Sequence, residues 1–388
     1  MYEVNGKYTS AKIFTSVEDI DVTEQTLTIC NHPIFKDCEV RIMPDCHKGK
    51  GCTIGFTAEM PKNGEIIPNI IGVDQSCGML TVKLKKSKTL NDFAKLDKVI
   101  RKFVPFGQNG RKEISSLVSD ELAEKVKQIS IDYLNENPNR DLNKIGSLGG
   151  GNHFISIEKG TTETYLIIHS GSRNFGKKLA IYFQKLAIET NCYQEGELKN
   201  LSYLTGKNAK NYLECAKICN EYAHFNRLVI AKEILSNMGW KAEDEFETIH
   251  NYIGEDRIIR KGAISCYKDE KVLIPLNMAD GSLICVGKGN SDWNNSAPHG
   301  AGRALSRTRA KDQLTMKEYK EQMKNIFSTC VSISTLDEAP MAYKNSEEII
   351  NAIEPTAEII DHLKPFTILR QRSNYSKSNK SLTGISKA

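Results

Sequence analysis

The order in which strand-like and helix-like segments follow one another is the feature that most limits how this chain can fold. Between about residues 40 and 84, apolar runs such as CEVRIMPDC, IIPNIIGVD and GMLTVKL alternate with Gly and Pro, which predicts strands joined by tight loops. From Phe93 to Phe103 apolar residues recur at helical spacing, and Pro105 ends that segment. A further strand is predicted over Tyr165 to Ile168, directly before His169.

The second half of the chain continues this irregular alternation. A long helix is predicted from Asn208 to Met238, with Gly239 as its C-terminal cap. Strands are predicted over Val272 to Leu276 and Leu283 to Gly287. Because the regular strand–helix–strand rhythm of a doubly wound sheet is missing, we expect an α+β fold with helical insertions, formed by residues 1–370 as one domain. Residues 371–388 are basic and polar without acidic residues, and we expect this tail to be disordered.

Composition narrows the class of protein. Of the 388 residues, 39% are hydrophobic and 26% charged, which excludes collagen, coiled coil and long disorder. No apolar run approaches the length of a membrane span, and the first residues lack a secretory stretch, so we expect a cytoplasmic protein that does not contact membranes. The 11 cysteines are odd in number and are scattered along the chain, and both features favour reduced thiols over disulfides. A net charge of +5 means that a polyanion would need a local basic cluster.

Histidines are concentrated in polar loops. Four of the eight lie in loops flanked by glycine or asparagine, namely His153, His169, His250 and His299. One such histidine is more often a hydrogen-bonded structural residue than a ligand, but the VDQSCG segment adds Asp74 and Cys77. Imidazole, thiolate and carboxylate together suit Mn, Co, Ni or Zn better than Mg or Ca. Because the spacing matches no local metal motif, the fold would have to gather these residues from separate loops.

A second group of residues suits phosphate. Arg173 lies in HSGSR, and Arg303 and Arg307 lie in HGAGRALSR, where guanidinium groups stand next to Gly- and Ser-rich backbone. Each arginine could equally be a solvated surface residue. The GSLGGG segment at residues 146–151 is a weak candidate for a phosphate cradle, because it matches neither of the common glycine-loop motifs.

Several longer motifs follow one another along the chain. They are MPDCHKGKGCTIG (Met43 to Gly55), IGVDQSCG (Ile71 to Gly78), GSLGGGNHF (Gly146 to Phe154), HSGSR (His169 to Arg173), HN (His250 to Asn251), RKGA (Arg260 to Ala263), HGAGRALSR (His299 to Arg307) and PMAYK (Pro340 to Lys344). In content and in order, over about residues 40–370, they resemble the RtcB RNA ligases. The resemblance implies a domain of mixed sheets around a cleft that holds two metal ions.

The resemblance also implies an activity. RtcB enzymes join an RNA 3'-phosphate or 2',3'-cyclic phosphate to a 5'-hydroxyl, with GTP and two manganese ions, through a guanylate carried by a histidine. Here that histidine would be His299. Cys77 would bridge the two ions, one completed by Asp74 and His153 and the other by His169 and His250. The substrates would be tRNA or rRNA fragments with broken ends, and the partners archease or a release-factor-like protein.

Further residues map onto nucleotide-binding positions of the family. The implied guanylate contacts are Asn152, Phe154, Asn251, Ser282, Ala301 and Tyr343, and the implied phosphate-binding arginines are Arg173, Arg303 and Arg307. Arg370 takes the place of a nucleotide-contacting lysine, and Arg and Lys differ in reach and geometry. The segment Pro275 to Met278 reads PLNM where the family has Pro-Gly-Ser-Met.

One departure concerns base recognition. Ser156 occupies a position that the family usually fills with a guanine-contacting carboxylate, so we expect weaker selectivity for GTP. Alternatively Glu158, two residues further on and on the same face of a strand, or a nearby backbone carbonyl replaces the missing acceptor.

Two other functions compete with RNA ligation. The first is a dinuclear metal phosphodiesterase acting on RNA ends, and the second is a protein that binds RNA ends without catalysis. Hydrolysis needs no nucleophilic histidine outside the metal ligands, which disfavours the first, and the retained ligand set disfavours the second. Cys46, His47 and Cys52 resemble a small metal site only weakly, and Cys215 and Cys219 are expected to be buried helix residues.

Overall fold

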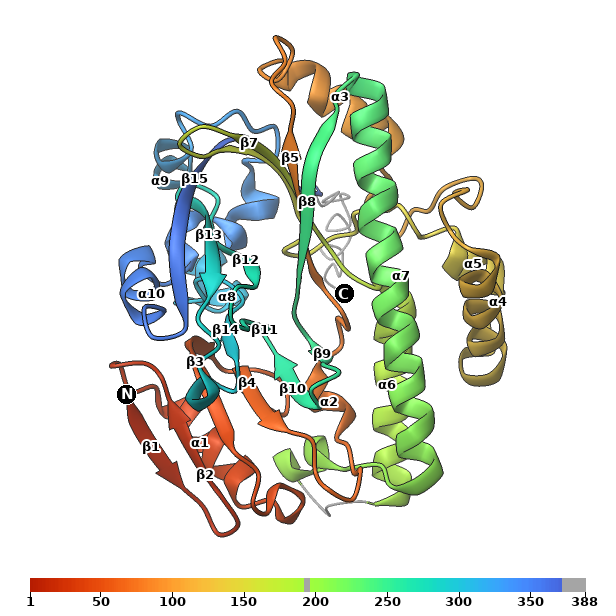
Figure 1. The fold of residues 1–388 in the computed structure, drawn as a ribbon, viewed down its shortest axis with the longest axis vertical. Coiled ribbons are helices and arrows are strands. Elements are labelled where there is room, and N and C mark those ends of the chain that lie inside the picture. The colour runs from red at the N-terminus through yellow and green to blue at the C-terminus, as the bar shows by residue number, and fades with distance from the viewer. Residues whose placement is uncertain (192–195, 372–388) are drawn as a thin grey trace, which may run out of the picture.

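The computed structural model describes residues 1–191 and 196–371 of the chain (Figure 1). Apart from Gln371, the tail predicted for residues 371–388 lies outside these described residues. That residues 1–370 form one domain stays a prediction. None of the helices in the described part combines the length and the apolar composition that crossing a bilayer requires.

Two large sheets form the framework, and a short two-stranded sheet lies in addition to them. The first has the order β1-β2-β3-β4-β10-β9: β1 (Tyr2–Asn5), β2 (Ser10–Ile13), β3 (Val40–His47), β4 (Ile54–Glu59), β10 (Ile258–Lys261) and β9 (Tyr252–Ile253). The second has the order β12-β13-β15-β6-β7-β5-β8: β12 (Lys271–Asn277), β13 (Gly281–Gly287), β15 (Ala357–Leu369), β6 (Phe154–Lys159), β7 (Thr164–Ser170), β5 (Gly78–Leu84) and β8 (Ala242–Ile249). The short sheet pairs β11 (Ala263–Ser265) with β14 (Ser296–Pro298).

Helices connect and cover these sheets. The α-helices are α1 (Ile20–Cys30), α2 (Pro68–Ile71), α3 (Phe93–Phe103), α4 (Asp120–Ile129), α5 (Pro138–Leu142), α6 (Arg173–Thr190), α7 (Gly206–Met238), α8 (Arg307–Gln313), α9 (Met316–Gln322) and α10 (Ser346–Ala352). Short helices of other types are η1 (Pro33–Phe35), η2 (Ser130–Leu134), η3 (Gly196–Leu201), η4 (Ser291–Trp293), η5 (Ile333–Glu338) and η6 (Pro340–Ala342). Figure 1 shows α7 running along the length of the molecule, next to α6.

The seven-stranded sheet curls until its two edge strands meet. The backbone N–H of Leu273 in β12 donates to Oγ1 of Thr248 in β8, at 3.0 Å. On the outer face of the curl, Ile230 and Ile234 of α7 and Leu96 of α3 pack against buried residues of the sheet such as Val82. This buried apolar area fixes α7 against β7 and β5 of the sheet.

The antiparallel register of four neighbouring strands, β6-β7-β5-β8, brings residues of several loops together where these strands begin or end. Gly78 at the start of β5 lies opposite Ser170 at the end of β7 and Ile249 at the end of β8. Phe154 at the start of β6 lies opposite His169. Because neighbouring antiparallel strands run in opposite directions, the start of one strand lies beside the end of the next.

Most of the predicted elements are confirmed, including the mixed α+β class. The helix of residues 93–103 is α3, the long helix is α7, and Gly239 ends it in a left-handed conformation at φ 70°. The predicted strand in IIPNIIGVD is wrong, because Pro68 begins the short helix α2 there. Proline suits the first turn of a helix, since its φ is already helical and its missing N–H has no partner in that turn. The cysteines of the described residues are buried free thiols, as expected.

The packing of α7 on the sheet predicts a large cost for shortening its buried face. Ile230 is fully buried, so Ile230→Ala should lower the free energy of unfolding by about 2–5 kcal/mol. Ile181 of α6 is 53% exposed, and the matched change Ile181→Ala should shift it by less than about 0.5 kcal/mol. Urea denaturation of both variants measures the difference; equal losses would show that Ile230 is not a core contact.

Candidate functional site

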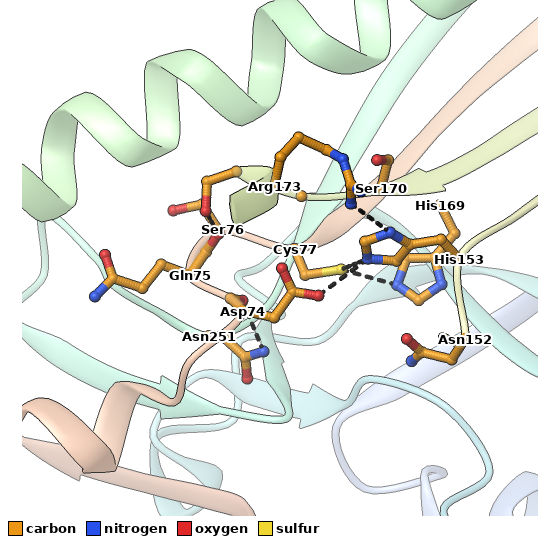
Figure 2. Close-up of polar contacts among 12 residues, drawn as sticks. Asp74, Gln75, Ser76, Cys77, Asn152, His153, His169, Ser170, Arg173 and Asn251 are labelled. Carbon is orange, nitrogen blue, oxygen red and sulfur yellow. Dashed lines mark hydrogen bonds and ion pairs between the residues drawn. The ribbon is translucent and has the colours of Figure 1, made fainter. Parts of the chain in front are cut away.

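Three of the predicted metal ligands converge at the strand ends described above. Cys77 lies just before β5, His153 lies just before β6, and His169 is the penultimate residue of β7. The Sγ atom of Cys77 lies 3.2 Å from Nε2 of His153 and 3.1 Å from Nε2 of His169 (Figure 2). All three residues are buried, and their ligand atoms lie within 4.8 Å of one another, which is close enough to hold one metal ion.

The other two predicted ligands lie at the margins of this cluster. Oδ2 of Asp74 is 3.0 Å from Nε2 of His153. The ring of His250, which follows β8, has its centroid 5.4 Å from that of His169 and 4.8 Å from that of His299. The geometry thus shows one three-residue cluster with Asp74 and His250 beside it; a pair of metal ions goes beyond what this arrangement shows.

Burial prepares these side chains for a cation. It lowers the pKa of His169 and of His250 well below 6.5, so both imidazoles are neutral and keep a lone pair. Burial, with the nearby Asp74, raises the pKa of the Cys77 thiol. A bound metal ion would reverse this preference, because the thiolate is the form that coordinates metals. Metal binding at Cys77 would therefore release a proton.

The ring of His153 is positioned by the loop that carries it and by Arg173. Its Nδ1 lies 2.9 Å from the carbonyl oxygen of Leu148 and 3.0 Å from Nη1 of Arg173. A carbonyl can only accept and a guanidinium can only donate, so Nδ1 bonds to Leu148 in one tautomer and to Arg173 in the other. The tautomer with its proton on Nδ1 leaves the lone pair on Nε2, beside Cys77, which is the orientation that metal-binding histidines usually have.

The GSLGGG segment packs around an arginine. Gly149 has φ 86°, and a β-carbon there would lie 1.7 Å from Nη2 of Arg173. Arg173 itself begins α6 with φ 58°, and its Nη2 donates to the carbonyl of Gly107. Glycine at position 149 thus makes room for the guanidinium beside His153. A phosphate cradle in this segment stays a prediction.

A cavity of about 320 Å³ opens in front of the cluster, within the range of small-molecule sites. It is lined by every predicted nucleotide contact except Arg173, together with His299 and four predicted metal ligands. The predicted residues on its wall are Asp74, Cys77, Asn152, Phe154, His169, His250, Asn251, Ser282, His299, Ala301, Arg303, Arg307, Tyr343 and Arg370.

His299 is held by a carboxylate that the sequence analysis missed. Oδ2 of Asp45, a fully buried residue of β3, lies 2.7 Å from Nδ1 of His299. The imidazole therefore donates from Nδ1, and its Nε2 is available on the cavity side. The signal for Asp45 was its place in the MPDCHKGKGCTIG segment. His47, two residues further on, also lines the cavity, whereas Cys46 and Cys52 belong to the apolar core.

Glu338 is a second buried carboxylate beside the cavity, and unlike Asp45 it lies in no motif that the sequence analysis singled out. It is buried, and its oxygens accept from Arg370 Nη1 at 2.8 Å and from the Tyr343 hydroxyl at 2.6 Å. Arg303 and Arg307 reach the other oxygen at 3.4 and 2.5 Å. Burial works to raise the pKa of Glu338, but Arg370 and Arg307 outweigh it and hold the pKa below 4.5. Glu338 thus arranges cations along one wall of the cavity.

One part of the cavity wall carries a buried acid, Glu158. Ser156 and Glu158 are both buried on β6, and the Ser156 hydroxyl donates to Oε1 of Glu158 at 2.8 Å. The Ser282 side chain also interacts with this carboxyl group and, like Ser156, acts to lower its pKa. Burial raises the pKa of Glu158 from 4.5 to about 7. Of the two residues, Glu158 lines the cavity, which favours it as the replacement for the missing acceptor.

A second cavity, of about 590 Å³, lies on the other side of Asp74 and His153. Its wall carries four cationic side chains, Arg140, Lys144, Arg173 and Lys177. Burial, with Arg140 and Arg173 nearby, lowers the pKa of Lys144. Because like charges repel at this range, an anion in the cavity would stabilise the group.

The sequence is similar to proteins of one family along nearly its whole length. The sequence matches the family described as tRNA-splicing ligase RtcB over residues 25–371. The RNA-splicing ligase RtcB of Escherichia coli K12 is 29% identical over 401 residues, covering 89% of this chain and 93% of the relative. The tRNA-splicing ligases RtcB of Methanococcus maripaludis and Archaeoglobus fulgidus are each 25% identical, covering 88% and 94% of this chain and 89% and 93% of their own lengths. With the match extending over nearly all of its length, the chain belongs to the RtcB family.

Proposed function

We propose that this protein is a GTP- and manganese-dependent RNA ligase that joins 3'-phosphate or 2',3'-cyclic phosphate ends to 5'-hydroxyl ends, in tRNA splicing or RNA repair. The observation that carries the proposal is His299, whose Nδ1 is held by Asp45 and whose ring lines the same cavity as Cys77 and His169. The names of the relatives, RNA-splicing and tRNA-splicing ligases, support an RNA substrate.

The donor atoms at the strand ends fit manganese. Thiolate, imidazole and carboxylate together suit a borderline transition metal. In the proposed pair, Cys77 would serve both ions, with Asp74 and His153 holding one and His169 and His250 the other. Bound ions would supply charge neutralisation at the phosphates and alignment for displacement at phosphorus.

His299 would act as the nucleophile. Its Nε2 attacks the α-phosphate of GTP, so that a nitrogen–phosphorus bond forms and pyrophosphate leaves. Asp45 accepts a hydrogen bond from Nδ1 and stabilises the positive charge that develops on the ring. An RNA 3'-phosphate oxygen then attacks the guanylate phosphorus and frees His299. The RNA 5'-hydroxyl finally attacks the activated 3'-phosphate, loses its proton and expels GMP.

The two cavities would divide the substrates between them. The nucleotide occupies the cavity that contains His299 and Glu158, while phosphates of the RNA backbone occupy the basic cavity lined by Lys144, Arg173 and Lys177. Asp74 lines both cavities, so the reacting phosphate would meet the metal ligands where the two adjoin.

The two alternative functions are less well supported. A metal phosphodiesterase activates water and has no use for a nucleophilic imidazole, yet His299 is oriented by a buried carboxylate. A protein that only binds RNA ends has no need of neutral imidazoles gathered around a buried thiol.

Replacing the nucleophile should abolish covalent guanylation. His299→Ala should carry no acid-labile label after incubation with GTP labelled at the α-phosphate, yet bind manganese as the unmodified protein does, because its ligands are elsewhere. His362→Ala, which removes a ring bonded to the Asp280 carbonyl, serves as the matched control and should label normally. Labelling of His299→Ala at the level of the control would refute the nucleophile assignment.

Cys77→Ser should be the most damaging change among the metal ligands. A bridging thiolate serves both ions, whereas each histidine serves one, and serine is a far poorer ligand at neutral pH. Metal content after dialysis measures the effect, with Cys38→Ser as a control thiol outside the cluster. Two tightly held manganese ions in Cys77→Ser would contradict the bridging role.

Glu158 should select the base, with a defined pH dependence. As a carboxylate it can accept two adjacent N–H groups of guanine, and Glu158→Gln should lower the preference for GTP over ATP at pH 8 by about tenfold or more. Because the pKa of Glu158 is about 7, the preference of the unmodified protein should weaken as the pH falls below that value and the acid takes up a proton.

Guanylation yields with GTP and ATP at equal concentration, measured from pH 6 to 8, check both effects. Ser156→Ala is the matched control, since it removes the neighbouring hydroxyl and leaves the carboxyl in place. A preference that is the same in Glu158→Gln and in the unmodified protein would exclude Glu158 from base recognition.

A further inference from the structure

Two adjacent residues of α7 lie directly behind the metal cluster. Asn226 and Arg227 are both fully buried, on the face of the helix that packs toward β5 and β7. Neither lines the two cavities, and neither belongs to the predicted site. Burying an amide and a guanidinium costs free energy that hydrogen bonds must offset, so their partners indicate what they do. Among the described residues, Nη2 of Arg227 has no partner, and the bonds of Arg227 are made by Nε and Nη1.

Asn226 ties two of the ligand-bearing loops together. Its Oδ1 accepts from the backbone N–H groups of Gly146 and Ser147, at 2.8 and 3.0 Å. Its Nδ2 donates to Oγ of Ser170 at 2.9 Å and to the carbonyl of Gly171 at 3.2 Å. One amide thus spans the loop that leads to His153 and the segment that follows His169.

The chain of bonds from Asn226 continues to a ligand. The Ser170 hydroxyl that accepts from Asn226 donates to the carbonyl of Leu148 at 3.0 Å. That carbonyl also accepts from Nδ1 of His153, at 2.9 Å. Asn226 is therefore linked through two hydrogen bonds to the carbonyl that His153 contacts.

Arg227 ties in the third loop. Its Nη1 donates to the carbonyl of Ser76 at 3.1 Å and to the carbonyl of Ser170 at 2.9 Å. Ser76 immediately precedes Cys77, and Ser170 immediately follows His169, so both carbonyls flank ligands (Figure 2). Ser76 has φ 56°, a conformation that a non-glycine residue keeps only when its surroundings hold it.

The charge of Arg227 is balanced within the protein. Its Nε donates to Oε1 of Glu247 in β8 at 2.9 Å, and Nδ1 of His224 lies 2.8 Å from Oε2. Burial works to raise the pKa of Glu247, but Arg227 and His224 outweigh it and lower the pKa to about 2. Glu247 lies three residues before His250, so the pair also anchors the strand that delivers this residue.

We propose that Asn226 and Arg227 are positioning residues that hold the loops of Cys77, His153 and His169 in place, so that their ligand atoms converge before a metal ion binds. The inference rests on the proposed metal-dependent function of the cluster. Side chains that orient metal ligands from behind commonly contribute about 10- to 100-fold in metal affinity.

Two conservative variants test this role. Asn226→Asp keeps acceptors for Gly146 and Ser147 but loses both donors, and Arg227→Lys keeps the charge but cannot reach three partners at once. Each should bind Mn²⁺ about 10- to 100-fold more weakly than the unmodified protein in calorimetric titration. With Co²⁺ in place of Mn²⁺, their thiolate-to-metal absorption should shift, which a general loss of stability would not cause. Lys217→Ala, an exposed change on α7, is the matched control and should match the unmodified protein in both measurements.

The outcomes separate this inference from the proposed function. Weaker metal binding and a shifted Co²⁺ spectrum in folded variants, as judged by circular dichroism and thermal melting, would support it. Unchanged affinity and spectrum in either folded variant would overturn the role of that residue while leaving the ligase proposal intact. Absence of metal binding by the unmodified protein would overturn the proposed function itself. If Arg227→Lys does not fold, Asn226→Asp decides; if neither folds, the pair serves the fold alone and the inference is rejected.

Discussion

The antiparallel pairing of β6, β7, β5 and β8 is the constraint on which the site depends. Because the start of each strand lies beside the end of its neighbour, four loops from distant parts of the sequence lie next to one another at these strand ends. A shift of one residue in this register would turn every side chain of the shifted strand to the opposite face. His169 would then point into the core instead of toward Cys77.

Buried carboxylates and cations refine what the register brings together. Asp45 orients His299, Glu338 gathers the arginines on the cavity wall, and Arg227, paired with Glu247, contacts the segments that carry the proposed metal ligands. Burying a charge costs free energy, which several hydrogen bonds offset at Glu338 and at Glu247, whereas among the described residues Asp45 has one side-chain hydrogen bond, to His299. The protein thus places fixed charges around a cavity where phosphate charge would be transferred, which is how preorganised sites act.

How far the sequence alone could lead is clear from particular residues. Helix α7 and the strands around His169 were predictable because apolar periodicity and a glycine cap are local signals. Cys77, His153 and His169 were predictable because their residue types and polar loops are unusual. Asp45, Glu338, Asn226 and Arg227 were not, because each acts through partners far away in the sequence: Asp45 and His299 are separated by 254 positions. The helix at Pro68 was misjudged because an apolar run of a few residues suits a strand and a short helix equally.

The central claim is that this arrangement joins RNA ends at the expense of GTP. The most direct measurement uses an RNA hairpin broken to leave a 3'-phosphate and a 5'-hydroxyl, incubated with the protein and Mn²⁺, with and without GTP. The account predicts a sealed strand only when GTP is present, with one GMP released per joint. Loss of the 3'-phosphate without joining, or joining that proceeds equally well without GTP, would contradict it.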